Sequence, residues 1–274
     1  MRRLLTFACD AATLAATLDA AAGETGLLLV TGGSQTRVGS HRMSESLSKS
    51  LSKAGIPCIR FDRRGVGDSE GEDPGFRASG PDIAAAAAAF RDEQPQLRRL
   101  IGFGLCDGAT ASALFGDAAG LDGLILVNPW LVEAASGEPP PAAIRRHYRE
   151  RLLSLDGWKR LLTGAVDYRK LFRGVLKSGQ TAPSTLAQEV AVAMARHRLP
   201  VELILATGDA TAIAAEAELK APVFKDLAVG VQRLETDSHT FARSGDGEKL
   251  RDAVLEAMRR LEDLATPHAR SSRA

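Results

Sequence analysis

The sequence predicts an α/β fold in which a mostly parallel sheet carries helices on both faces. Short apolar, β-rich segments such as GLLLVTGG (26–33) and RRLIGFGL (98–105) alternate with helical segments such as MSESLSKSLSKAG (43–55). This alternation is typical of parallel strands joined by crossover helices. A chain of 274 residues, 45% of them hydrophobic, is long enough for one such domain with a substantial core.

Eight strands are expected. The first two, LLTFAC and TLAATLD, predict a hairpin joined around residues 10–12, because Asp10 and Asp19 interrupt the apolar run that a secretory signal would need. Further strands are expected at 26–33, 56–62, 98–105, 121–130 and 201–209, and residues 231–241 are expected to form a last strand and the loop that follows it. Helices are expected at 43–55, 81–94, 107–118, 211–219 and 247–264. We therefore assign residues 1–129 and 199–265 to an α/β core, 130–198 to a helical lid inserted after the sixth strand, and 266–274 to a flexible tail.

Composition argues against several classes of protein. The formal net charge is +1, so no overall field favours nucleic acid as a partner. The three cysteines are far apart and form no CxxC pair, which argues against a zinc site or a disulfide framework and favours a reducing, cytoplasmic location. No P-loop, no GxGxxG after the first strand and no metal-ligand spacing is present, so we expect no cofactor and no metal.

A strand that ends in GLCDG and leads directly into a helix predicts a nucleophile elbow at Cys106. The sharp turn raises the central residue above the carboxyl edge of the sheet, at the positive end of the following helix, where a thiolate is favoured. The alternative is that Cys106 is a small buried hydrophobic residue, as we expect for Cys9 and Cys58. The strand–turn–helix context favours the catalytic interpretation.

A nucleophile of this kind needs an acid and a histidine, which follow it in that chain order. Asp209 ends LILATGD, and His239 in ETDSHTF follows the last predicted strand. The alternatives are that Asp209 caps a helix, which is compatible with catalysis, and that His239 is an ordinary loop residue. Asp237 is a rival acid, although its position two residues from His239 favours a role in the turn.

An oxyanion hole needs two backbone N–H groups directed at the developing negative charge. We assign them to Asp107, directly after the nucleophile, and to Ser34 in the loop TGGSQTRVGSHR. Gly33 and Gln35 of this loop, with Trp130 after the sixth strand and Phe172 in the lid, are the expected substrate-binding residues. The alternative for the loop is an ordinary glycine turn.

The predicted lid carries an uneven charge. Residues 141–177 contain ten lysines and arginines but three acids, with apolar residues at helical spacing between them. A solvated helix face above an apolar underside is the simpler explanation. The alternative is attraction to an anionic acyl carrier, an acidic glycan or a membrane surface.

These motifs resemble the α/β-hydrolase superfamily over nearly the whole chain: VTGGS after the third strand, FDRRGVGDSEG after the fourth, and GLCDG at the elbow. GGSQTRVGSHR, GLCDGAT and LVNPW are more narrowly similar to hydrolases associated with bacterial exosortase A systems, which accompany exopolysaccharide gene clusters. The resemblance implies an α/β-hydrolase fold. In two departures, cysteine replaces the usual serine, and Gly32-Gly33 replace the usual His-Gly.

The leading hypothesis is a hydrolase that cleaves a small-molecule ester or thioester through an acyl-enzyme on Cys106. One alternative is acyl transfer to a sugar or carrier, in which a hydroxyl group replaces water. Another is a non-catalytic protein of the same fold that binds a ligand, for which a reactive thiol has no use.

Overall fold

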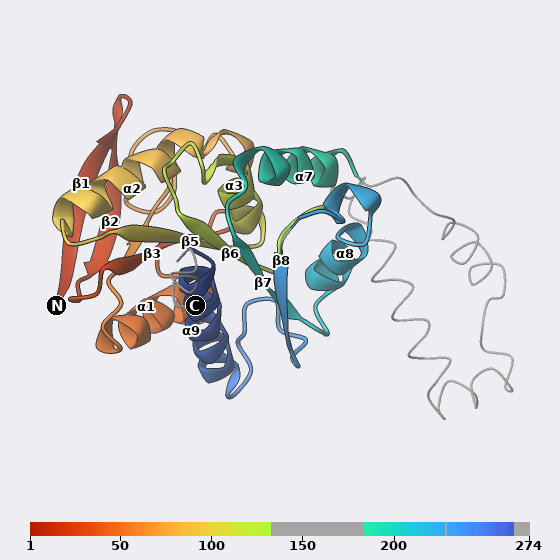
Figure 1. The fold of residues 1–274 in the computed structure, drawn as a ribbon. Helices are drawn as coiled ribbons and strands as arrows, with labels where there is room; N and C mark the ends of the chain where they lie inside the picture. The colour runs from red at the N-terminus through yellow and green to blue at the C-terminus, as the bar shows by residue number, and fades with distance from the viewer. Residues whose placement is uncertain (133–183, 228, 266–274) are drawn as a thin grey trace, which may run out of the picture.

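The computed structural model describes residues 1–132, 184–227 and 229–265. Eight strands of this part form one sheet with the order β1-β2-β4-β3-β5-β6-β7-β8 (Figure 1). The strands are β1 (Arg2–Cys9), β2 (Ala12–Asp19), β3 (Thr25–Val30), β4 (Cys58–Phe61), β5 (Arg99–Leu105), β6 (Gly123–Val127), β7 (Val201–Ala206) and β8 (Val229–Leu234). The longer helices are α1 (Met43–Lys53), α2 (Gly80–Glu93), α3 (Asp107–Phe115), α7 (Thr185–His197), α8 (Ala210–Glu218) and α9 (Asp246–Ala265).

The predicted mostly parallel sheet is confirmed. β1 pairs antiparallel with β2, and β2 pairs antiparallel with β4, whereas β4, β3 and β5 to β8 run parallel to one another. The expected hairpin is present, with Cys9 opposite Ala12 and Asp10 at a positive φ of 51° in the turn. Several strands are shorter than the apolar runs that predicted them, because the last residues of each run leave the sheet and form the loops at its edge.

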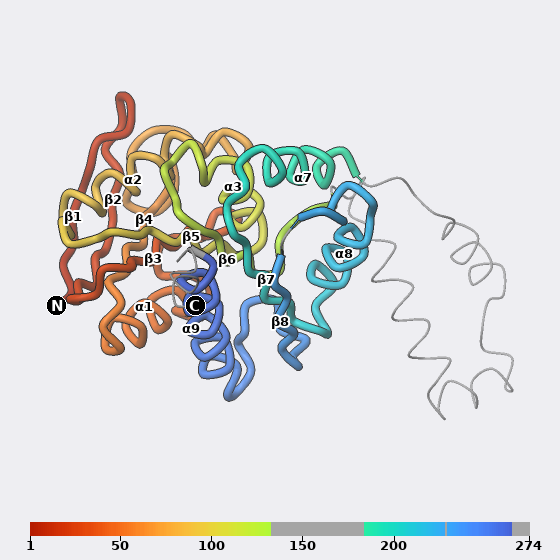
Figure 2. Tube along the Cα trace, in the orientation of Figure 1, coloured from red at the N-terminus to blue at the C-terminus, as the bar shows by residue number. Residues whose placement is uncertain are grey.

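Helices cover both faces of the sheet. α1 and α9 lie on one face, and α2, α3 and α7 lie on the other (Figures 1 and 2). Side chains of β3 alternate accordingly: Leu27 and Leu29 pack towards α1 and α9, whereas Leu28 and Val30 pack on the opposite face. The two faces therefore bury separate hydrophobic clusters, as expected for a sheet covered on both sides.

α7 lies inside the range predicted to be a lid. Ser184 caps it by accepting the Ala187 N–H at 3.1 Å, and its Leu186, Val190 and Met194 are buried in the core on the α3 side. Residues 133–183, which hold most of the predicted lid, and the predicted tail at 266–274 lie outside the described residues. Among the helices of the described part, none is both long and apolar enough to cross a membrane.

The parallel strands place their carboxyl ends along one edge of the sheet. Residues 31–35 follow β3, residues 62–63 follow β4, Cys106 follows β5, and residues 128–130 follow β6. The loop 207–209 follows β7, and the loop that contains His239 follows β8. Ligands of open α/β sheets bind at this edge, so the topology alone brings the predicted site residues to one place.

The close contact between α3 and β5 depends on the absence of a side chain at Gly104. A Cβ on Gly104 would lie 2.5 Å from Ala109 Cα and 2.5 Å from Gly108 O, which are backbone atoms, whereas one on Gly102 would mainly meet the end of the Leu121 side chain, at 2.6 Å. We expect Gly104→Ala to lower the free energy of unfolding by roughly 1–3 kcal/mol. Gly102→Ala is the matched control on the same face of β5 and should lower it less, because a leucine side chain moves more easily than backbone. Urea unfolding measures both, and equal losses would contradict this account.

Candidate active site

Cys106 occupies the sharp turn between β5 and α3. Its φ of 59° and ψ of −126° lie in a region that a residue with a side chain rarely adopts, which is the strained backbone expected of a nucleophile elbow. The neighbouring strand holds the turn, because the Cys106 N–H donates to Val127 O at 3.0 Å and the Trp130 N–H donates to Cys106 O at 3.1 Å. The thiol is half-buried, whereas Cys9 and Cys58 are buried.

His239 and Asp209 meet beside this thiol. His239 Nδ1 lies 2.9 Å from Asp209 Oδ2, and Cys106 is close enough to contribute to the raised pKa of the imidazole. The same Asp209 oxygen accepts the Ala212 N–H at 2.9 Å, so Asp209 also caps α8. The N-cap bond fixes the carboxylate in the orientation that receives the imidazole. The structure therefore places the predicted acid against the predicted histidine, with Cys106 near the same imidazole.

The surroundings of His239 favour its protonated form. Burial acts to lower the pKa of the imidazole, but hydrogen bonds to Asp209 and Cys106, and the charges of both groups, outweigh it and raise the pKa to about 10. A raised pKa means that the imidazole keeps its proton through the neutral range. The Asp209 carboxylate beside Nδ1 compensates the positive charge of the imidazolium.

Asp237 and His197, two further candidates for the acid and the histidine, are paired with other residues. Asp237 is exposed and paired with Arg243, which lowers the pKa of its carboxyl group, so it does not orient His239. His197 Nδ1 lies 2.9 Å from Asp117 Oδ2, so this histidine at the end of α7 pairs with an acid just after α3. His147 and His268 lie outside the described residues.

The loop after β3 packs directly on the elbow. A Cβ on Gly32 would lie 2.5 Å from Leu105 O and 2.6 Å from Asp107 Oδ1, which explains why a side chain is absent there. The Gly33 N–H donates to Asp107 Oδ1 at 2.5 Å, and Gly33 O accepts a hydrogen bond from Arg63 Nη2. Among the described residues, the N–H groups of Ser34 and Asp107, the two predicted oxyanion donors, have no acceptor.

Of the four predicted substrate-binding residues, Gly33 and Gln35 lie in the loop after β3 and Trp130 lies beside the elbow. Both polar groups of the Gly33 backbone are engaged, and Gln35 Oε1 accepts the Ser40 N–H at 3.0 Å, which braces the loop. Trp130 adjoins the elbow, and its carbonyl accepts the Thr110 hydroxyl at 2.6 Å. Phe172 lies outside the described residues, as does the basic segment 141–177.

Two further residues belong to this site although sequence reasoning did not single them out. Asn128 is fully buried, accepts the Ala206 N–H at 2.8 Å and donates from Nδ2 to His239 O at 2.9 Å, so it positions the histidine loop. Arg63 is buried beside the loop after β3. The sequence offered one signal for both residues. Each is a polar residue that comes just after an apolar strand whose carboxyl end lies at this edge of the sheet.

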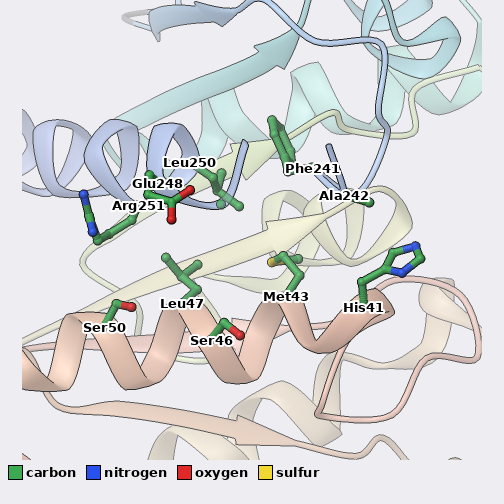
Figure 3. A pocket seen from close by; sticks show the side chains of 11 residues that line it. His41, Met43, Ser46, Leu47, Ser50, Phe241, Ala242, Glu248, Leu250 and Arg251 are labelled. Atoms are coloured by element: carbon green, nitrogen blue, oxygen red, sulfur yellow. The ribbon is translucent and has the colours of Figure 1, made fainter. Parts of the chain in front are cut away.

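A hollow of about 250 Å³ lies next to the site, between α1 and α9 (Figure 3). His41 and Ala242 lie at one end of it, and Leu47 of α1 and Leu250 of α9 face each other between the helices (Figure 3). Cys106 does not line it. This hollow is therefore separate from the position at which the nucleophile would meet a substrate.

Comparison with known proteins supports the same fold. A sequence profile of the Alpha/beta hydrolase family matches residues 27–253. No curated protein sequence matches the chain.

Several solved structures are similar in fold. The esterase Pf2001 from Pyrococcus furiosus has a TM-score of 0.65 at 14% identity, covering 95% of this chain and 92% of that one. Est1E from Butyrivibrio proteoclasticus, with ferulic acid bound, has a TM-score of 0.62 at 17% identity, covering 96% and 100%. XC6422 from Xanthomonas campestris, described as a serine hydrolase without a lid, has a TM-score of 0.59 at 20% identity, covering 94% of each chain.

The three cysteines should differ in reactivity. Burial raises the pKa of Cys9 to about 11, with a further contribution from its hydrogen bond to Asp82, and burial also raises the pKa of Cys58. Cys106 is more exposed and has the His239 partner. We expect iodoacetamide to modify Cys106 at least about tenfold faster than the other two at neutral pH, and His239→Ala to slow Cys106 alone. Peptide mass spectrometry of the folded protein measures the rates, and equal rates at all three would contradict the assignment.

Proposed function

The chain belongs to the alpha/beta hydrolase family, and on that premise we propose that it hydrolyses an ester or thioester through an acyl-enzyme on Cys106. The observation that carries this proposal is the line Cys106–His239–Asp209 at the strained turn after β5. A residue is held at a positive φ only where the surrounding structure imposes it, and such strain concentrates at functional sites.

The geometry supports the following sequence of steps. The Cys106 thiolate attacks the acyl carbon, and the carbonyl electrons move to oxygen, where the N–H groups of Ser34 and Asp107 stabilise the negative charge. The oxyanion collapses, the bond to the leaving group breaks, and His239 gives that group its proton. The imidazole, now neutral, then takes a proton from water, which attacks the thioester carbon and releases the acid while Cys106 returns as a thiolate. Asp209 holds the imidazole in place throughout.

Two sequence features indicate the class of substrate in this proposal. The similarity of the loop after β3 to exosortase A-associated hydrolases favours an acyl group from exopolysaccharide biosynthesis. Attraction of an anionic acyl carrier or a membrane surface to the basic segment 141–177 belongs to the same proposal.

The decisive experiment is to expose the protein to a panel of activated acyl esters and thioesters and look for an acyl adduct by intact-mass and peptide mass spectrometry. We expect one adduct, on Cys106, that disappears with time as water releases it. Cys106→Ala should abolish the adduct and all turnover, because no other group of the line forms a covalent bond. Cys58→Ala is the matched control and should leave acylation unchanged, since that thiol is buried. A panel that leaves Cys106 unmodified would contradict the proposal.

The same experiment separates the alternatives. An adduct that clears faster when a sugar hydroxyl is supplied, with the acyl group appearing on the sugar, would assign the protein as an acyltransferase. A protein that binds acyl ligands without any adduct would be a binding protein of this fold.

The raised pKa of His239 predicts the alkaline limit of the reaction. The protonated imidazole gives the leaving group its proton, and it persists through neutral pH and is lost as the pH rises through about 10. We expect kcat/KM for an ester with a poor leaving group to fall above about pH 10, by up to tenfold for each further pH unit. Alkylation of Cys106 by iodoacetamide should show no such fall, because iodide leaves without a proton. A fall that begins near pH 7 would contradict this assignment.

A further inference from the structure

Arg63 is the buried charge that the proposed chemistry leaves unexplained. It follows β4, its side chain is 2% exposed, and its Nε and Nη1 are buried without a hydrogen-bond partner among the described residues. Its nearest carboxylate, Asp73, is 4.0 Å away from Nη2. Burying a guanidinium with so few partners costs free energy, so fold stability alone is a poor explanation for it.

The one hydrogen bond that Arg63 makes in the described part of the chain goes to the oxyanion loop. Arg63 Nη2 donates to the Gly33 carbonyl. That carbonyl and the Ser34 N–H belong to the same peptide unit, which is planar and trans, so the two groups point in opposite directions. Whatever fixes the Gly33 carbonyl therefore also fixes the direction of the Ser34 N–H.

The preceding peptide unit is fixed from the other side. The Gly33 N–H donates to Asp107 Oδ1 at 2.5 Å, and Asp107 directly follows the nucleophile. Gly33 has a φ of 57°, and a Cβ there would meet nothing within 4 Å, so the space on that side of the residue is open. Bonds within the loop, from the Gln35 N–H to Gly32 O at 3.3 Å and from the Thr31 hydroxyl to Gln35 O at 3.0 Å, close it around Gly33. The Gly33 backbone itself is bonded by two charged side chains, Arg63 and Asp107.

We propose that Arg63 is a positioning residue for the oxyanion hole: its bond to the Gly33 carbonyl directs the Ser34 N–H at the substrate oxyanion and strengthens it as a donor. This inference rests on the proposed function. A cation on a carbonyl polarises the whole peptide unit, which increases the positive charge on the N–H at its opposite end. The guanidinium also offsets the Asp107 carboxylate, whose negative charge would otherwise oppose an oxyanion beside it.

The test compares two reactions of the same thiol. A trifluoromethyl ketone adds to the Cys106 thiolate without a leaving group: the sulfur–carbon bond forms, and the carbonyl electron pair moves to oxygen as an oxyanion that needs the hole. Iodoacetamide alkylates the same thiolate, displaces iodide and forms no oxyanion. Fluorine NMR measures the affinity of the ketone adduct, and mass spectrometry measures the alkylation rate.

We expect Arg63→Met to weaken the ketone adduct by about tenfold or more, on the scale at which an oxyanion donor matters, while the alkylation rate changes by less than about twofold. Arg63→Lys keeps a charged donor and should recover most of the affinity. Arg60→Met is the matched control: Arg60 is an equally buried guanidinium in β4, three residues before Arg63, that donates to Arg37 O at 2.9 Å, farther along the same loop, instead of to Gly33. It should lower thermal stability and leave the adduct unchanged.

The outcomes separate this inference from the proposed function. An adduct of unchanged affinity in Arg63→Met would overturn the inference while leaving acyl-enzyme chemistry intact, and so would parallel losses in both reactions. A third outcome is that the ketone adduct forms and depends on Arg63 while acyl esters do not modify Cys106. This result would count against the proposed function alone. If Arg63→Met does not fold, Arg63→Gln keeps an uncharged donor and should give an intermediate loss, and an unchanged affinity there would equally overturn the inference.

Discussion

The backbone of Cys106 is the constraint on which the rest of this molecule depends. A positive φ at a residue with a side chain is unfavourable by itself. Here it persists because β5 and α3 flank the turn, and because hydrogen bonds to Val127 and Trp130 hold the Cys106 backbone. The absence of a side chain at Gly104 lets α3 begin directly against β5. The consequence is functional, since the turn presents the thiol at the carboxyl edge of the sheet, where the loops after β3, β7 and β8 also arrive.

Each partner of the thiol is held by an interaction that also serves the fold. Asp209 caps α8 and receives His239 with the same oxygen, and Asn128 joins the end of β6 to β7 while it holds the carbonyl of His239. Such double use makes the site rigid, because moving either side chain would also break backbone hydrogen bonds of the core. Rigid donors and acceptors need little reorganisation during reaction, which is the main source of electrostatic stabilisation of a transition state.

The sequence predicted much of this arrangement, for identifiable reasons. The strands were recognisable because each is a short apolar run that ends in turn residues, and Cys106, Asp209 and His239 were selected by their positions after particular strands. The position of Asp209 after the seventh strand already favoured it over Asp237, and the structure adds the physical reason, since Asp237 is exposed and paired with Arg243. Asn128 and Arg63 were missed because their roles are contacts with His239 and Gly33, which are 111 and 30 residues away along the chain.

The departure of this chain from the common His-Gly pair also has a physical explanation. The space that a side chain at Gly32 would need is occupied by Leu105 O and Asp107 Oδ1, so in this arrangement the position accommodates only glycine. Asp107 then takes over the fixing of the loop through the Gly33 N–H, at the cost of a negative charge beside the place where the oxyanion develops. A positive charge on the opposite side of Gly33 is the simplest compensation, and Arg63 supplies it. Gly32, Asp107 and Arg63 are thus best understood as one unit, in which the substitution of any one member changes what the other two must do.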